Sequence, residues 1–317
     1  MRSKKFLLTI VIPLYNESSN LVWHHGKIID YCKKNSIQAE ILYVNDGSTD
    51  NSLQVVKRLA KHDSSIRYIS LSRNFGKEAA TTAGLKASTG DVVLLIDADG
   101  QHPINKLGSF IKKWQEGYDV VIGIRKANNK EGFVKRFGSK LYTSMSNVII
   151  EENVKKGSTD FRLLDRKVVN EFNQLTERNR ITRGLIDWLG FKRCYIDFIS
   201  PERHSGVATY SFSKLVKLAL HSFTSQSTKP LQFTGYLGSL VTVLSSLLGI
   251  FLVLQKYVFN DPLKLAISGS ALLAIFLSFL VGLVLICQWL LAIYIESIHN
   301  ETQNRPLYIV SEESISK

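Results

Sequence analysis

The sequence predicts an α/β fold with a mostly parallel, Rossmann-like sheet, followed by a C-terminal hairpin of two transmembrane helices. Three observations predict this arrangement. Apolar strand patterns alternate with helical patterns as far as residue 124, which is typical of a doubly wound sheet. Polar loops follow several of the strands, and the clearest is Asp-Ala-Asp at 97–99. Two long segments without any charged residue follow Lys229.

The elements follow one another regularly, and each has a local justification. Every predicted strand is a short run dominated by Val, Ile, Leu or Tyr, and every predicted helix places apolar residues three or four positions apart. The strands are Leu7–Pro13, Glu40–Asn45, Ile66–Ser70, Asp91–Ile96 and Val120–Ile124. The helices between them are Ser19–Asn35, Ser52–His62, Lys77–Ala87 and Lys106–Glu116. The pattern is less regular after Ile124.

Two uncharged segments near the C-terminus predict the membrane hairpin. Residues 230–255 and 265–295 contain no Asp, Glu, Lys or Arg, and each exceeds the roughly 20 residues that cross a bilayer. A buried core helix is the alternative, but two such segments follow each other closely. We expect spans at about 233–255 and 266–294, joined by a turn too short to be a domain. Residues 296–317 then form a cytoplasmic tail.

The charge distribution predicts which side of the membrane the large domain occupies. The chain has a net charge of +13, and residues 1–229 hold 36 of its 40 basic and 22 of its 27 acidic residues. This positive-inside bias, and the absence of a signal-peptide pattern, favour the plasma (inner) membrane with a cytoplasmic domain and both termini cytoplasmic. No nucleic-acid-binding motif accompanies the charge, which fits a domain beside anionic lipid. Three scattered cysteines indicate no disulfide framework.

The segment before the hairpin predicts an interfacial helix. Within 210–229, the residues 210–223 place apolar side chains at helical spacing and interleave them with Lys214, Lys217 and His221. Such a basic amphipathic helix is typical of a membrane surface. A helix of the protein core is the alternative.

The most informative segment is VVLLIDADGQHP at 92–103, where a buried-strand pattern ends at Asp97 and Asp99. Open α/β sheets bind ligands at the carboxyl ends of their strands. Two carboxylates there are hard oxygen ligands that suit Mg²⁺ or Mn²⁺ holding a diphosphate. Taken alone, the motif also fits an ordinary solvated loop.

Loops after three strands carry further candidate residues. Residues 13–17 follow the first strand and residues 45–50 the second. The turn in 45–50 can bind a base or ribose, or it can simply cap the next helix through Ser48, Thr49 or Asp50. The loop 72–77 carries Arg73 and Lys77, which either meet phosphate or belong to a solvated basic loop.

Together these segments resemble family 2 glycosyltransferases with the GT-A fold, and most closely the membrane-anchored polyprenyl-phosphate group. The resemblance covers nearly the whole chain in order. It is carried by IVIPLYNES (10–18), VNDGSTD (44–50), SRNFGKEAA (72–80), DADGQHP (97–103), GSTDFRLLDR (157–166), PERHSG (201–206) and STKPL (227–231). It implies an inverting hexosyltransferase that moves a sugar from a nucleotide sugar, a UDP-sugar in our expectation, to undecaprenyl phosphate for cell-surface glycan modification.

The resemblance also implies a role for each matching residue. The nucleotide sugar would be held by Pro13, Tyr15, Glu17, Asp46, Lys77 and Asp97, and the metal by Asp97, Asp99 and Gln101. Asp160 matches the catalytic carboxylate, with Asp99 beside it. The lipid phosphate would be held by Arg203 and Ser139, with Lys135 or Lys140. These features are compatible with a homo-oligomer and do not require one.

The role of Asp160 and the nature of the acceptor remain open at this point. Asp160 can be a general base, an orienting group, or a structural partner of Arg162 or Arg166. A phosphate acceptor needs no strong base, because its second pKa is about 6, whereas a hydroxyl acceptor does. A glycosyltransferase acting on a glycan hydroxyl, or an inactive membrane scaffold, are therefore the competing functions.

Overall fold

The computed structural model describes residues 5–126, 157–178, 180–201, 247, 254 and 269–314. The chain forms two compact units. The first comprises Met1–Tyr210 together with Arg305–Lys317, and the second comprises Ser211–Asn304.

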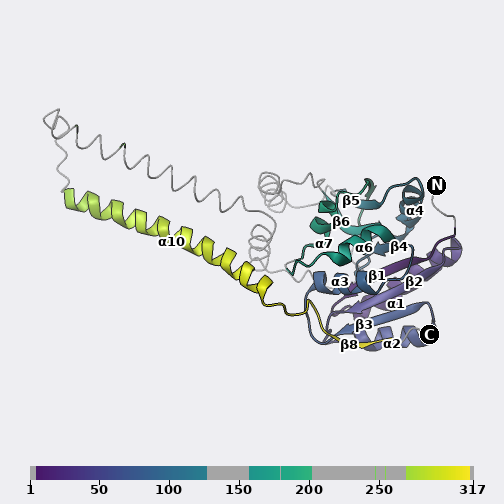
Figure 1. Ribbon diagram of the computed structural model, residues 1–317. Helices are drawn as coiled ribbons and strands as arrows, with labels where there is room; N and C mark the ends of the chain where they lie inside the picture. Colours follow the sequence, from purple (N-terminus) through teal and green to yellow (C-terminus); the bar gives the residue numbers. More distant parts are fainter. Residues whose placement is uncertain are drawn as a thin grey trace. The chain divides into compact units, whose positions relative to one another are not determined.

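The first unit is built on a mixed sheet of eight strands among the described residues, in the order β7-β5-β6-β4-β1-β2-β3-β8 (Figure 1). The strands are β1 (Leu8–Leu14), β2 (Ala39–Asn45), β3 (Ile66–Leu71), β4 (Val92–Leu95), β5 (Val120–Arg125), β6 (Ser158–Asp165), β7 (Arg193–Phe198) and β8 (Val310–Glu313). The central strands β4, β1, β2 and β3 are parallel. Two strands break the pattern, because β6 is antiparallel to both β4 and β5 and β8 is antiparallel to β3.

Helices pack on both faces of this sheet and form two hydrophobic clusters. The first cluster contains buried residues of α1 (Ser18–Lys34), α2 (Ser52–His62) and α4 (Leu107–Gln115), which follows the short 3-10 helix η1 (Ile104–Lys106). The second contains buried residues of α3 (Lys77–Ala87), α6 (Arg166–Gln174) and α7 (Thr182–Trp188). Alternate residues of β1 point to opposite clusters: Ile10 and Ile12 join the first, and Val11 the second. Strands covered on both faces are therefore apolar throughout.

The predicted α/β fold with a mostly parallel sheet is confirmed. All five predicted strands and four predicted helices are present, with small differences at their ends. No element was predicted from the sequence at the positions of β6, α6, α7, β7 and β8. In β6 the cause is Arg162, which interrupts an apolar run and yet is almost completely buried.

The second unit contains α10, which runs from Gly269 to Thr302. Within the part of the chain that the structure describes, no helix is both long enough and apolar enough to cross a membrane. The amphipathic segment 210–229, and the first expected span apart from residues 247 and 254, lie outside the described residues. The transmembrane hairpin stays a prediction.

The segment 296–317 that we expected as a tail is divided by the structure. Its first residues complete α10, and Val310–Glu313 form β8 at the edge of the sheet beside β3. The Ser72 amide donates to the Ile309 carbonyl at 2.9 Å, and Lys57 forms an ion pair with Glu312 at 2.7 Å. The C-terminal strand thus covers an edge that would otherwise expose unpaired backbone groups.

Candidate active site

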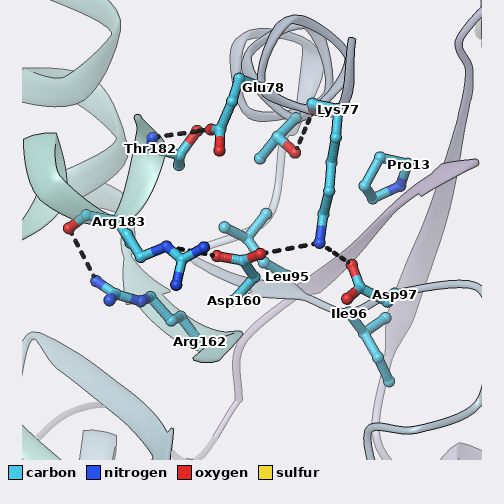
Figure 2. Close-up of a pocket in the computed structure, with 11 residues that line it drawn as sticks. Pro13, Lys77, Glu78, Leu95, Ile96, Asp97, Asp160, Arg162, Thr182 and Arg183 are labelled. Atoms are coloured by element: carbon cyan, nitrogen blue, oxygen red, sulfur yellow. Dashed lines mark hydrogen bonds and ion pairs between the residues drawn. The ribbon is translucent and has the colours of Figure 1, made fainter. Parts of the chain in front are cut away.

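A polar pocket lies where β1 and β4 end and β6 begins (Figure 2). Strands β1 and β4 supply apolar walls, α3 and α7 supply polar side chains, and β6 supplies a carboxylate and an arginine. The lining residues are Pro13, Lys77, Glu78, Thr81, Leu95, Ile96, Asp97, Asp160, Arg162, Thr182 and Arg183. The pocket thus occupies the carboxyl edge of the parallel strands, where α/β sheets bind ligands.

Four charged side chains form a line of alternating sign in this pocket (Figure 2). The ammonium nitrogen of Lys77 lies 2.6 Å from Oδ1 of Asp97 and 2.9 Å from Oδ2 of Asp160. On the other side of Asp160, Nε of Arg183 lies 3.6 Å from Oδ1. The order is therefore Asp97, Lys77, Asp160, Arg183.

These contacts change the proton affinity of the groups involved. Burial by itself raises the pKa of Asp160, but Lys77 and Arg183 outweigh burial and hold this pKa well below its usual range. Burial by itself lowers the pKa of Lys77, and the two carboxylates raise that pKa above its usual value. Asp160 is therefore an ionised carboxylate with low affinity for protons, which makes it a poor general base at neutral pH.

Helix α7, which carries Arg183, is fixed at two points. Glu78 in the first turn of α3 accepts a hydrogen bond from the Thr182 amide at 2.8 Å and another from the Thr182 hydroxyl. Arg162 donates to the Arg183 carbonyl at 3.2 Å and pairs with Asp187 at 3.0 Å. The Arg162 and Asp187 side chains are only 1% and 4% exposed, so the pair is shielded from water.

The ion pairs of Asp160 do not involve Arg162 or Arg166, which the sequence had left open as alternative structural partners. The ion-pair partners of Asp160 among the described residues are Lys77 and Arg183. Arg162 pairs with Asp187, and Arg166 donates to the Gly90 carbonyl at 2.7 Å.

A buried histidine, His102, contacts the backbone of the Asp-Ala-Asp loop. His102 stacks on Phe161 with ring centroids 5.1 Å apart, and its Nδ1 accepts the Asp97 amide at 3.1 Å. Its Nε2 lies 3.8 Å from Oδ2 of Asp97, beyond ordinary hydrogen-bond distance, so His102 supports this loop through the Asp97 backbone. Burial lowers the pKa of His102, which favours its neutral form. His102 lies in the loop after β4 and is buried.

The two acids of the motif differ in exposure. The Asp97 side chain is 28% exposed at the pocket, whereas Asp99 is buried and its Oδ1 accepts the Gln101 amide at 3.0 Å. The Gln101 side-chain oxygen accepts from Arg125 at 2.6 Å. The structure therefore turns only Asp97 of this predicted trio into the pocket.

The residues fit a divalent cation that shares its ligands with a substrate. No group of three or more His, Cys, Asp or Glu side chains converges as a metal centre among the described residues. Mg²⁺ in particular is often held by one or two carboxylates plus substrate phosphates, without an all-protein cage. Asp97 offers such a carboxylate at the pocket. The roles of Asp99 and Gln101 as ligands stay predictions.

Asp46 organises the loop that leads to Lys77. Its two carboxylate oxygens accept the amides of Phe75 and Gly76 at 2.7 and 2.9 Å. Gly47, at φ +61°, lies so close to this loop that a Cβ would meet the Arg73 carbonyl carbon at 2.3 Å. The loops after β2 and β3 therefore support each other, and Asp46 positions the start of α3. Its contact with a nucleotide stays a prediction.

The loops after β1 and β2 are also joined. Asn16, whose φ is +56°, accepts the Thr49 amide at 2.8 Å and donates its own amide to the Ser48 hydroxyl at 3.0 Å. Asp50 accepts the Ser52 amide at 2.9 Å at the start of α2. The N-cap residue of α2 is Asn51, so none of the three capping candidates occupies that position. Asp50 accepts the amides of both Ser52 and Ser18, while Ser48 and Thr49 bond to Asn16.

Of the remaining residues predicted to bind the nucleotide sugar, only some line the pocket. Pro13 lines the pocket. Tyr15 is 43% exposed, and Glu17 accepts the Asn20 side chain at 2.6 Å; neither lines the pocket. Arg203, Ser139, Lys135 and Lys140 lie outside the described residues, as do the positions around them, so their predicted contacts with a lipid phosphate stay predictions.

Sequence reasoning missed Glu78, Arg162, Thr182 and Arg183. All but Glu78 lie in the region where the strand–helix pattern was not recognised. Arg162 alone carried a usable signal, since an arginine inside an apolar run requires a buried partner. That partner, Asp187, lies on α7 and only the fold reveals it.

Comparison with known proteins places the chain in a family. The model of glycosyl transferase family 2 matches residues 9–172. A putative glycosyltransferase CsbB from Bacillus subtilis is 37% identical, over 98% of this chain and 93% of that protein. A prophage-derived bactoprenol glucosyl transferase from Shigella flexneri is 33% identical, over 96% of this chain and 97% of the relative. Crystalline mannosyl-3-phosphoglycerate synthase from Rubrobacter xylanophilus has a similar fold, with a TM-score of 0.50, 18% identity and coverage of 68% of this chain and 71% of that one.

The chain therefore belongs to glycosyl transferase family 2, and its α/β unit has the GT-A-like fold expected for that family. Within the family it belongs to the polyprenyl-phosphate group, as the resemblance in the sequence predicted. The protein is a glycosyltransferase enzyme.

Proposed function

We propose that this enzyme transfers a hexose from a UDP-sugar to undecaprenyl phosphate at the cytoplasmic leaflet of the plasma membrane, with inversion at the anomeric carbon. The observation that carries the proposal is the position of Asp160 between Lys77 and Arg183. A carboxylate held by two cations is a weak proton acceptor. Such a site suits an acceptor that is already ionised.

A polyprenyl phosphate is an acceptor of this kind. Its second pKa is about 6, so it is mostly dianionic at neutral pH. One phosphate oxygen forms a bond to the anomeric carbon, while the bond from that carbon to the diphosphate oxygen breaks and the nucleoside diphosphate leaves. This single displacement inverts the configuration and requires no proton transfer from the acceptor. The name of the Shigella relative, a bactoprenol glucosyl transferase, supports this choice of acceptor.

The donor would bind on the Asp97 side of the pocket. A nucleotide sugar places its diphosphate at the carboxyl ends of β1 and β4, beside Pro13 and Asp97. Mg²⁺ or Mn²⁺ held by Asp97 would neutralise the leaving diphosphate as a Lewis acid. Lys77 is placed to stabilise the same negative charge. We propose UDP as the nucleotide.

The sequence supports membrane attachment. The uncharged segments 230–255 and 265–295 would supply a hairpin, and the basic domain before them favours the cytoplasmic side. An acceptor embedded in the bilayer then meets the pocket at the leaflet where nucleotide sugars are available. Both termini would be cytoplasmic.

The test is transfer by the purified full-length protein. It is incubated with a panel of nucleotide sugars and undecaprenyl phosphate, with Mn²⁺ or with EDTA. We expect one UDP-hexose to give a glycosylated lipid phosphate only with the metal. Full activity in EDTA would overturn the metal assignment.

Two other outcomes would replace the proposal. Transfer to a glycan hydroxyl but to no polyprenyl phosphate would establish the hydroxyl-directed alternative. Turnover of no nucleotide sugar, by a folded protein, would identify an inactive scaffold.

A further inference from the structure

Arg183 presents an unused hydrogen-bonding edge to the pocket. Its Nε lies 3.6 Å from Oδ1 of Asp160, beyond ordinary hydrogen-bond distance, and its side chain is 46% exposed. Within the described residues its Nη groups donate no hydrogen bond. A guanidinium has five N–H donors in a planar fork, so most of its donors remain available to a ligand.

The backbone that carries Arg183 is anchored on both sides. Glu78 holds the preceding residue, Thr182, through its amide. Arg162 donates to the carbonyl of Arg183 itself at 3.2 Å, and it is locked by Asp187. Two contacts therefore fix the backbone on either side of Arg183, while its guanidinium stays accessible. This arrangement is typical of a binding residue, because little order remains to be gained when the ligand arrives.

The position of Arg183 assigns it to one end of the pocket. Asp97 and Lys77 lie on one side of Asp160, and Arg183 lies on the other (Figure 2). If the donor diphosphate occupies the Asp97 end, the acceptor must approach from the opposite side of the reacting carbon in an inverting displacement. Two arginines line that far end among the described residues; Arg162 is buried and paired with Asp187, whereas Arg183 is exposed to the pocket.

We propose that Arg183 binds the phosphate group of the acceptor; this rests on the function proposed above. A phosphate dianion next to the Asp160 carboxylate is repelled by its charge. Arg183 offsets this repulsion and offers two parallel N–H groups that match phosphate oxygens. Asp160 in turn keeps the guanidinium turned toward the pocket. Arg183 would thus select an acceptor with a phosphate over one with a neutral hydroxyl.

The competing explanation is that Arg183 only keeps Asp160 ionised and in place. A positioning role predicts a lower kcat with little change in acceptor affinity. A binding role predicts a higher KM for lipid phosphate, with donor affinity unchanged. The two roles therefore separate in steady-state kinetics.

The experiment compares wild type, Arg183→Ala, Arg183→Lys and the control Arg58→Ala in the full-length protein. Arg58 is an exposed arginine of α2 that does not line the pocket, so the control removes the same charge elsewhere. KM is measured for undecaprenyl phosphate and for the nucleotide sugar. Binding of farnesyl phosphate, a short prenyl phosphate, is measured separately without donor.

We expect Arg183→Ala to raise the KM for undecaprenyl phosphate and to weaken farnesyl phosphate binding by roughly 10- to 100-fold, the range of hydrogen bonds to charged groups. Arg183→Lys should recover part of the loss, and Arg58→Ala should match wild type. Unchanged acceptor KM and unchanged binding in Arg183→Ala would overturn the assignment, as would an equal loss of donor affinity.

The binding measurement separates this proposal from the proposed function. If wild type glycosylates no polyprenyl phosphate but binds farnesyl phosphate through Arg183, the reaction is wrong and the phosphate site stands. If wild type is active and Arg183→Ala binds equally well, only the site is wrong. If wild type shows neither transfer nor binding, both are overturned.

Discussion

The ammonium group of Lys77 lies 2.9 Å from Oδ2 of Asp160 although the two residues are 83 positions apart in the chain. Lys77 is the first residue of α3, and its nitrogen also contacts Asp97 at 2.6 Å. One cation thus neutralises two carboxylates, Asp97 and Asp160. In the function proposed above, the same ammonium would already be positioned for the negative charge of the leaving diphosphate.

Replacing Lys77 by Met should lower kcat by roughly 100-fold or more, the usual effect of losing one preorganised donor to developing charge. The fold should survive, because the Lys77 side chain is 42% exposed. The control is Lys86→Met, an exposed lysine in the last turn of the same helix. Steady-state turnover and a melting curve check both statements. Equal activity of the two variants would contradict a role for Lys77.

The buried Arg162–Asp187 pair should be costly to break. Asp187→Asn leaves the buried Arg162 guanidinium without its partner charge, which typically costs about 3–5 kcal/mol. Both side chains are almost fully buried, so water cannot compensate. We expect a clearly lowered melting temperature and faster hydrogen exchange in α7.

The matched control for this pair is the exposed ion pair of Lys113 and Glu116, which are 2.7 Å apart. Replacing Lys113 by Met should leave the melting temperature unchanged, because exposed pairs add little stability. If the buried and the exposed replacements lowered the melting temperature equally, burial would not determine how much an ion pair contributes to stability.

His24 should make the protein sensitive to acid. Burial lowers the pKa of His24 to about 4, against 6.5 for an ordinary histidine, and neither ring nitrogen has a hydrogen-bond partner among the residues that the structure describes. As the pH falls from 6.5 to 4, the unfolded chain takes up a proton that the folded chain does not. The part of the unfolding free energy that depends on neutral His24 is therefore fully present above pH 6.5, and it falls by up to about 3 kcal/mol near pH 4.

This pH dependence can be tested by substitution. His24→Phe removes the titrating group, so the unfolding free energy should fall less between pH 7 and pH 4.5 than in wild type. The exposed His62 provides the control, and His62→Phe should keep the wild-type dependence. A His24→Phe curve parallel to that of wild type would rule out this source of acid sensitivity.

Removal of the C-terminal strand should loosen the edge of the sheet. Deleting residues 308–317 removes β8, the Ile309 acceptor of the Ser72 amide and the Ser314 acceptor of the Tyr68 amide. We expect faster hydrogen exchange at Tyr68 and Ser72 and a greater tendency to aggregate, because an edge strand with free backbone groups pairs with other chains. Deleting only residues 315–317 leaves β8 intact and is the control. Unchanged exchange at both amides would contradict this role.

Much of the fold was predictable because its signals are local. Strands such as β1 and β4 are covered on both faces by helices, so nearly every residue in them is apolar and the run is easily recognised. The strands β6 and β8 lack that signal. β6 contains the buried Arg162, and β8 (VSEE) is polar because it lies at an exposed edge.

The sequence by itself determined the class of fold, the family and the place of Asp97 and Asp99 after a buried strand, since all of these are written in contiguous residues. Only the tertiary structure decided that Lys77 lies between Asp97 and Asp160 and that Arg183 lies on the other side of Asp160. It also decided that Asp46 binds the backbone of the loop that precedes Lys77. An ion pair depends on where two distant segments meet, and pairing leaves no periodic pattern in either segment. That is why Lys77, Asp97 and Asp160 were predicted individually, whereas their arrangement and the part played by Arg183 were not.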